Sequence, residues 1–393
     1  MIRIQNAVTE YIVLDKKNNY NIVTFIDINE NWTDSELTPL FSKWIAHNPI
    51  LTHYIVEKEG ICYWHQESDP DLKQENFMKI VSTDSSQFDS YSKIMLNLTF
   101  PFKYKWMWVI LNDVPHNKSR VYIKISHAYC DGYNLIDMIV NTLGSYKKPV
   151  FTRKAAQSLL HKIYYNVVGV LVLFTMHLKV LLNVFSKKSK VVDSKMDVLK
   201  CKTLNLTRLK QKTKKLGVTL NDYLYALSVR TLHLYEKKSI LSMTPINVSN
   251  KTSIYDTNNM HFILNEHELN SDLKTASNYF NLCKHTWFIP ITHKIITTLA
   301  SIVPSSVNSF WCNKILNNVD MSFTNMIGPT LTEHPKLLKI SNIVFFTVTN
   351  SNEICFNIIS FGQKINVYIS FKESKHLDRT RFKQCFKQAY REL

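Results

Sequence analysis

Glycine, proline and paired cysteines are scarce in this chain of 393 residues. It contains 7 glycines and 11 prolines, too few for a collagen-like or low-complexity sequence. The seven cysteines are odd in number and widely spaced, and none forms a C-x-x-C pair. This pattern therefore does not indicate a zinc finger or a disulfide framework. We expect a protein that has no metal site and works in a reducing compartment.

Acidic residues are also few, with 31 Asp and Glu against 48 Lys and Arg, which gives a formal net charge of +17. Such a charge suits a polyanion: nucleic acid, an anionic membrane surface or a phosphorylated cofactor. We find no finger, helix-turn-helix or aromatic–basic motif, so nucleic acid is not an expected partner. The opening residues Met1–Asn6 contain no apolar signal core, and we expect a cytoplasmic protein.

The first part of the chain predicts mixed α and β structure. A β-rich run is followed by a capping signal and a helix that should end before Pro49. Residues 106–111 predict a buried strand, and the alternation in Val121–Ser126 predicts a half-buried one. Apolar residues at helical spacing follow from Leu135 to Leu143. His127–Gly132 should therefore form a turn between a strand and a helix.

The middle of the chain contains a long apolar run, Tyr164–Phe185, followed by Lys187, Lys188 and Lys190. The run approaches the length of a membrane-spanning helix, but it includes Lys179 and His177, which are costly inside a bilayer. We expect an interfacial or hairpin-like membrane contact; the alternative is a buried connector. A second apolar stretch, residues 287–302, could share that surface. Residues 186–202 are predicted to be a linker.

The second half predicts a basic helix over residues 207–216, a further helix from Thr219 to about Glu236, three strands and a final helix. We therefore divide the chain into residues 1–150, an apolar segment and linker over 151–202, and residues 203–393. A chain of this length suits two domains.

The strand-to-helix turn carries the residues best suited to catalysis. An imidazole such as that of His127 is a natural base for a hydroxyl near neutral pH. Asp131 could turn back to fix the loop, and Gly132 would allow a backbone conformation closed to other residues. The alternative is a structural histidine with an aspartate that caps the next helix.

The sequence resembles the wax ester synthase/diacylglycerol acyltransferase family, which is related to chloramphenicol acetyltransferases and peptide-synthetase condensation domains. Ser126–Gly132 is similar to the family motif HHxxxDG. Ser126 replaces the first histidine of the motif, and His127 is its second histidine. Other segments resemble family motifs in the same order: His47–Leu51, Pro101–Trp106, Val218–Asp222, Pro245–Ser249, Phe323–Pro329, and Val367–Phe371 with Asp378. Ile327 stands where the family has proline, and the arginine expected after Pro245–Ser249 is missing.

This resemblance implies two chloramphenicol-acetyltransferase-like α/β domains with mixed sheets and an active-site tunnel between them. It implies transfer of a fatty acyl group from acyl-CoA, as co-substrate, to a fatty alcohol or diacylglycerol, with His127 as general base. Asn325 is then a candidate donor to the tetrahedral oxyanion. Lys212, Lys214 and Lys215 are candidates for the phosphates of coenzyme A, although a solvated helix face is the simpler interpretation. Asn221 and Asp222 are better explained as helix-capping residues.

Lipid substrates also imply a cytoplasmic enzyme held peripherally at a membrane, such as the endoplasmic reticulum or a lipid droplet if the cell is eukaryotic. Two alternatives remain open at this point. One is an acyltransferase with a small-molecule or peptidyl acceptor. The other is a catalytically degenerate relative that binds acyl chains or scaffolds a membrane, which the substitution at Ser126 keeps open.

Overall fold

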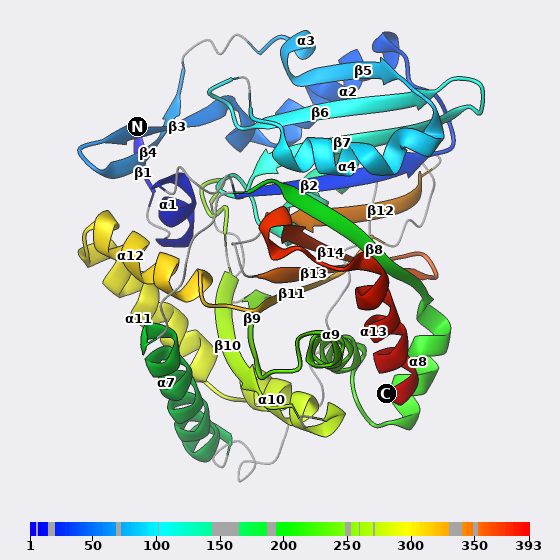
Figure 1. The fold of residues 1–393 in the computed structure, drawn as a ribbon. Helices are drawn as coiled ribbons and strands as arrows, with labels where there is room; N and C mark the ends of the chain where they lie inside the picture. The colour runs from blue at the N-terminus through cyan, green and yellow to red at the C-terminus, as the bar shows by residue number, and fades with distance from the viewer. Residues whose placement is uncertain are drawn as a thin grey trace.

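The computed structural model describes residues 1–4, 7–14, 20–67, 72–100, 102–143, 165–186, 194–247, 253–258, 260–269, 272–329, 340–348 and 353–393. Two mixed β-sheets lie one above the other, each with helices packed on it (Figure 1). Of the predicted features, Tyr164, Pro101, the lysines at 187, 188 and 190, and the loop around Asn250 lie outside the described residues.

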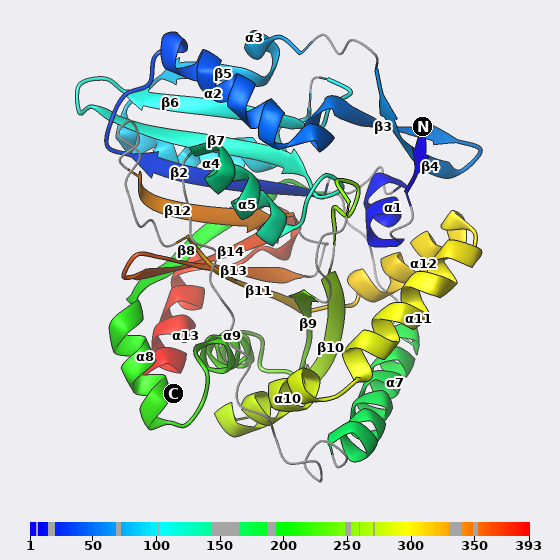
Figure 2. The same cartoon turned by 180° about the vertical axis from the view of Figure 1, so that it is seen from behind.

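The N-terminal sheet has the strand order β12-β2-β7-β6-β5, and only β5 and β6 pair in parallel. Its strands are β2 (Asn21–Ile28), β5 (Met78–Ser82), β6 (Trp106–Asp113), β7 (Lys118–Ser126) and β12 (Ile340–Thr347). Helices α2 (Asp34–His47) and α5 (Gly132–Leu143) cover one face, and α4 (Phe88–Asn97) covers the other (Figures 1 and 2). A small separate sheet joins β1 (Ile2–Arg3), β3 (His53–Lys58) and β4 (Ile61–Gln66).

The C-terminal sheet has the order β10-β9-β11-β13-β14-β8. Its strands are β8 (Met196–Asn205), β9 (Ile240–Asn247), β10 (Met260–His267), β11 (Met321–Ile327), β13 (Ile354–Phe361) and β14 (Lys364–Lys372). An apolar core joins this sheet to α9 (Leu220–Glu236), α10 (Leu273–His285) and α13 (Arg379–Glu392), while α8 (Leu206–Lys215) lies at its edge.

Four further helices gather at one flank, where both views show them side by side: α1 (Ala7–Leu14), α7 (Val170–Ser186), α11 (Phe288–Ile302) and α12 (Ser305–Leu316) (Figures 1 and 2). The remaining short elements are α3 (Gln74–Phe77), a π-helical turn (Tyr165–Gly169) that leads into α7, and three 3₁₀ turns (Pro49–Thr52, Ser85–Gln87 and Glu373–Lys375).

Local signals in the sequence position these elements. The capping box of helix α2 joins its N-cap Thr33 to Glu36, and the helix ends at His47, with Asn48 as its C-cap before Pro49, as predicted. Helix α9 begins at Thr219, and Asp222 completes its capping box. The cap of α9 is thus Thr219 with Asp222, rather than an Asn221–Asp222 pair.

Two predictions about strands are wrong. Strand β7 is buried on both faces, because Tyr122 and Lys124 point into α4 rather than into solvent; the Lys124 Nζ donates to the Met95 carbonyl over 2.6 Å. The predicted linker extends too far, since β8 begins at Met196 and pairs with β14. The alternation of apolar and polar residues in β7 does not reveal the burial of Lys124, because an ammonium group can be buried where it donates to the carbonyls at the end of a helix.

Strand β12 joins the two halves of the chain. It follows β11 in sequence but pairs antiparallel with β2 in the N-terminal sheet. Buried polar contacts tie it to the C-terminal sheet as well, because the Asn366 Nδ2 donates to the Asn342 Oδ1 over 2.6 Å and the Ser370 Oγ donates to the Thr347 carbonyl over 2.6 Å. The N-terminal sheet therefore contains a strand from the region predicted to be the second domain.

Candidate active site

The turn after β7 holds His127 between the two sheets. The His127 backbone N–H donates to the Tyr20 carbonyl over 2.8 Å, and the Asp131 N–H donates to the Thr257 carbonyl over 2.9 Å. The first bond ties the turn to the beginning of β2, and the second ties it to the loop before β10. His127 therefore lies in a turn between strand β7 and helix α5, as predicted.

Asn258, which the sequence did not single out, fixes the orientation of the imidazole. Its Nδ2 donates to the His127 carbonyl over 2.8 Å and to the Thr9 Oγ1 over 2.9 Å. The Asn258 Oδ1 therefore faces the His127 Nδ1 at 3.0 Å and accepts its proton. This tautomer leaves the His127 Nε2 as the atom with a free lone pair, which is the form a general base requires.

The protonation state of His127 follows from its surroundings. Burial lowers the pKa of the imidazole below its ordinary 6.5, and the charge of Asp131 acts in the opposite direction. The lowering dominates because removing imidazolium from water disfavours the charged form. His127 is thus neutral at neutral pH and ready to accept a proton.

Asp131 caps the helix that follows the turn. Its Oδ1 accepts the Asn134 N–H over 2.8 Å at the first turn of α5, and its side chain is buried. No direct hydrogen bond joins the Asp131 carboxylate to the His127 ring among the described contacts. Asp131 therefore positions the loop and acts on His127 through its charge, as the structural interpretation of this residue predicts.

Gly132 is needed for space rather than for an unusual backbone conformation. Its φ is not positive, whereas a Cβ added to it would lie 2.6 Å from the Met326 Sδ on β11. The prediction that Gly132 supplies a conformation closed to other residues is therefore wrong. The missing side chain lets α5 approach β11 closely at the boundary between the two sheets.

The structure does not bring Asn325 to His127. The Asn325 Nδ2 donates to the Asn221 Oδ1 over 3.0 Å, at the beginning of α9. Its neighbours Ser322 and Thr324 line the cavity with His127 instead. Successive residues of a strand face opposite sides, so Asn325 points away from the cavity. Its prediction as an oxyanion donor is not supported.

A cavity of about 270 Å³ contains His127. Residues from β2, β9, β10, β11 and β12 line it, together with residues from the flanking helices α1, α11 and α12. Most of the lining is apolar: Ile12, Ile22, Met243, Met260, Phe262, Leu264, Ile296, Ile315, Leu316 and Phe345. Tyr20, His261, His293, Thr297 and Glu353 are among the polar members. Such a lining suits a ligand with a long hydrocarbon part and few polar groups.

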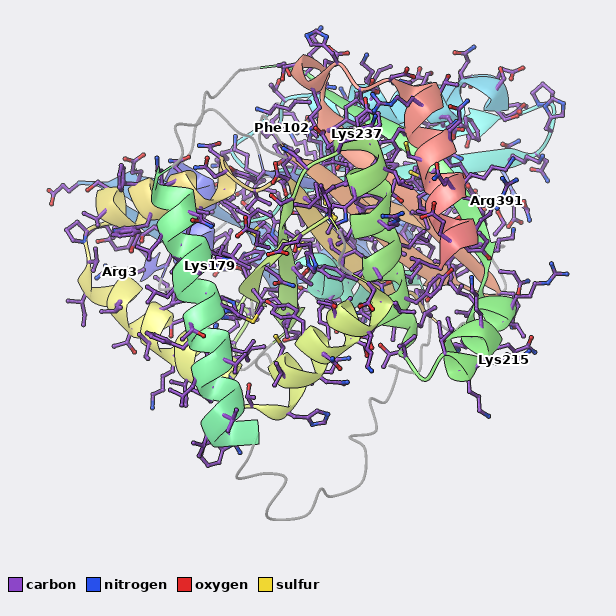
Figure 3. The ribbon with its side chains drawn as sticks, turned by 60° about the horizontal axis from the view of Figure 1, so that its bottom comes forward. Arg3, Phe102, Lys179, Lys215, Lys237 and Arg391 are labelled. Carbon is purple, nitrogen blue, oxygen red and sulfur yellow. The ribbon has the colours of Figure 1, made fainter. Side chains whose placement is uncertain are left out.

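The predicted coenzyme A lysines lie elsewhere. Lys214 and Lys215 are exposed on α8, and the Lys212 Nζ contacts the Tyr223 hydroxyl at 3.0 Å. Figure 3 shows Lys215 at the side of the molecule opposite to Lys179 on α7. None of the three lysines lines the cavity, so the structure does not connect them with His127.

Helix α7 presents apolar side chains on two opposite faces. Leu173, Val180 and Val184 are buried against the C-terminal half, whereas Leu171 and Leu182 are 61% and 63% exposed. The stretch Asn166–Val184 is long and apolar enough to cross a membrane, with mean hydropathy 2.1. Only 22% of it is buried inside the protein, so most of this apolar stretch is not covered by the rest of the chain. It is a continuous helix, so a hairpin is excluded over these residues.

The exposed apolar surface continues over the two neighbouring helices. Its other members that are more than half exposed are Val167 and Phe174 on the side of α7, and Trp287, Ile295, Ile296, Leu299, Ile302 and Phe310 on the side of α11 and α12. No Asp or Glu occurs in α7, α11 or α12, and their charged residues are Lys179, Lys294 and Lys314. We call this three-helix surface the apolar flank.

Comparison with known proteins gives a consistent picture. Residues 259–393 match the sequence model of the family described as WS/DGAT C-terminal domain. No curated protein sequence is significantly similar to the chain.

Solved structures match the chain over nearly its whole length. The wax ester synthase/diacylglycerol acyltransferase from Marinobacter aquaeolei VT8 has a TM-score of 0.62 at 12% identity, covering 100% of this chain and 98% of that one. The trichothecene 15-O-acetyltransferase from Fusarium sporotrichioides has a TM-score of 0.63 at 11% identity, covering 99% and 94%. A first condensation domain of the calcium-dependent antibiotic synthetase has a TM-score of 0.62 at 8% identity, covering 99% and 96%.

These structures confirm the predicted fold class, with two mixed α/β halves. The predicted resemblance is thus confirmed: residues 259–393 match the C-terminal domain model of the wax ester synthase/diacylglycerol acyltransferase family, which supports an acyltransferase, and the whole chain shares the fold of these solved structures.

Proposed function

We propose that this chain is an acyl-CoA-dependent O-acyltransferase that transfers a fatty acyl group to a lipid hydroxyl, forming a wax ester or triacylglycerol. The observation that carries the proposal is a neutral His127, oriented by Asn258, in an apolar cavity between the two sheets. An apolar lining favours a lipid acceptor over a peptidyl one.

His127 acts as general base. The acceptor hydroxyl donates a hydrogen bond to the Nε2, which takes the proton as the oxygen attacks the thioester carbonyl carbon. The tetrahedral intermediate then collapses, the carbon–sulfur bond breaks, and the imidazolium returns its proton to the thiolate of coenzyme A. Base catalysis of this kind contributes about 10²–10⁴-fold in rate. Asn258 keeps the proton of the neutral ring on the Nδ1, and Asp131 favours the transient imidazolium through its charge.

The apolar flank supports a place for this reaction at the cytoplasmic face of a membrane or at a lipid droplet. Helix α7 packs one face against β10, where the Leu264 N–H donates to the His177 Nε2 over 3.4 Å, and this contact supports a helix that lies on the protein surface over one that spans a bilayer. A flank with lysines and no carboxylates suits acidic lipid surfaces. Ile296 both lines the cavity and is exposed on the flank, which would give lipid substrates a short path.

Product analysis tests the proposal. Purified protein would be incubated with palmitoyl-CoA and a mixture of hexadecanol and dioleoylglycerol, and the extracted lipids analysed by mass spectrometry. We expect palmityl palmitate, triacylglycerol or both, together with free coenzyme A in equal amount. Binding of palmitoyl-CoA without any ester product would favour a non-catalytic acyl-binding protein and contradict the proposal.

A further inference from the structure

The apolar cavity contains a pair of histidines that the acyl-transfer step does not use. His261 on β10 and His293 on α11 both line the cavity, and their rings meet edge to face with centroids 5.8 Å apart. The His261 side chain is 6% exposed. A buried imidazole nitrogen without a hydrogen-bond partner carries a desolvation cost, which a polar group of a ligand would offset.

Hydrogen bonds around His261 determine which of its nitrogens remains available. The Thr292 hydroxyl has one proton, which it donates to the Phe288 carbonyl over 2.7 Å. The His261 Nε2 lies 3.2 Å from the same hydroxyl and must therefore donate to it. The His261 Nδ1 then has a lone pair without a hydrogen-bond partner among the described residues.

His293 is available in a similar way. Neither of its ring nitrogens has a hydrogen-bond partner in the part of the chain that the structure describes. Burial lowers the pKa of His293 and, with the neighbouring imidazoles, that of His261 to about 4. Both rings are neutral near pH 7, so the pair offers one N–H donor and two acceptor nitrogens to an uncharged ligand.

His261 lies close along the chain to Asn258, the residue that contacts the proposed base His127. Asn258, which contacts His127, precedes His261 by three residues. Three extended residues span at most about 10 Å. A single substrate molecule can therefore reach both His127 and the histidine pair.

We propose that His261 and His293 bind a second oxygen of the acyl acceptor and so select a partial acylglycerol over a simple fatty alcohol. This inference rests on the proposed acyl transfer. The His293 N–H donates to an ester carbonyl or hydroxyl of the glycerol backbone, and the His261 Nδ1 accepts from a second hydroxyl where one is present. An alkyl chain in the same place leaves these polar atoms unpaired, which disfavours it.

The test compares two acceptors with the same acyl donor. The kcat/KM would be measured for monooleoylglycerol and for hexadecanol, with palmitoyl-CoA, in wild type and in His293→Leu. His293 has no hydrogen bond to the described protein, so this variant should fold. His293→Gln retains an N–H donor, and His47→Leu, at an exposed histidine on α2 that does not line the cavity, is the matched control.

We expect His293→Leu to lower kcat/KM for monooleoylglycerol about 10-fold, the effect of one lost hydrogen bond, and to leave that for hexadecanol unchanged or raise it, because the leucine leaves no polar nitrogen unpaired against the alkyl chain. His293→Gln should recover part of the loss, and His47→Leu should match wild type. An equal loss with both acceptors, or no loss with either, would overturn the subsite. Absence of ester from both acceptors in wild type would instead contradict acyl transfer itself, and the subsite would fall with it.

Discussion

The contact between His127 and Asn258 joins two residues separated by 131 positions and fixes which nitrogen is free to act as the proposed base. Replacing Asn258 with leucine should lower kcat about 10- to 100-fold, because the neutral ring is no longer held in the productive tautomer. Asn258→Asp keeps an acceptor for the Nδ1 proton and adds a charge that raises the pKa of His127. As the pH is lowered, this variant should therefore begin to lose activity at a higher pH than wild type does. A structural role for Asn258 alone would leave the profile unmoved in both variants.

The wild-type pH–rate profile should fall on its acidic side, where His127 becomes protonated. Burial lowers the pKa of His127, so activity at pH 6.5 should still equal activity at pH 7 and should decline only below pH 6.5. Asp131→Asn removes the charge that raises the pKa of His127, and the limb should move to still lower pH. Asparagine caps a helix about as well as aspartate, so thermal stability should change little. A limb that moves upward, or a large loss of stability, would contradict this account of Asp131.

At the scale of single residues, the sequence predicts His127 as the candidate base but not the residues that contact it. The strand–turn–helix pattern marks His127 because strand alternation, glycine and helical spacing are all local. Asn258 stands in a polar loop whose composition resembles any other loop, so only the folded chain reveals its role. Asn325 is on a short strand, and the face to which it points depends on how β11 packs, which its motif does not record.

The approach of α5 to β11 is the clearest dependence of one element on another. Gly132→Ala places a Cβ against the Met326 Sδ, which is 2.6 Å away. We expect it to lower the free energy of unfolding by about 1–3 kcal/mol, measured by urea denaturation. Shortening the partner should relieve the clash, so Gly132→Ala combined with Met326→Val should be less destabilised than the sum of the two single variants. Strict additivity would show that this contact does not limit the approach.

Most helices and strands are predictable because their amphipathic spacing and capping residues lie within a short stretch of the sequence, as in α2 and α13. The assignment of strands to sheets is not. β12 is buried and apolar, and nothing in its residues shows that it pairs with β2 rather than with its neighbours in sequence. The sequence also does not predict where β8 begins, because the alternating lysines of this strand resemble those of a solvated linker.

The apolar flank belongs to the scale of the whole molecule, because three separate helices build it. We expect the protein to sediment with membranes and to be released by carbonate, as a peripheral protein would be. Leu178→Asp with Leu182→Asp, on the exposed face of α7, should shift protein to the soluble fraction without lowering Tm. Val180→Asp on the buried face should lower Tm instead. Full retention after carbonate would favour a spanning helix, and a wholly soluble wild type would contradict the membrane contact.

The central claim is that His127, presented in the cavity between the two halves, takes the proton of a lipid hydroxyl. The most direct measurement is the rate of palmitoyl transfer from palmitoyl-CoA by purified His127→Ala, with circular dichroism and Tm recorded for the same preparation. We predict a rate at least about 100-fold below wild type with an unchanged fold, since base catalysis contributes at least that factor. A folded His127→Ala that retains more than about a tenth of the wild-type rate would contradict the claim.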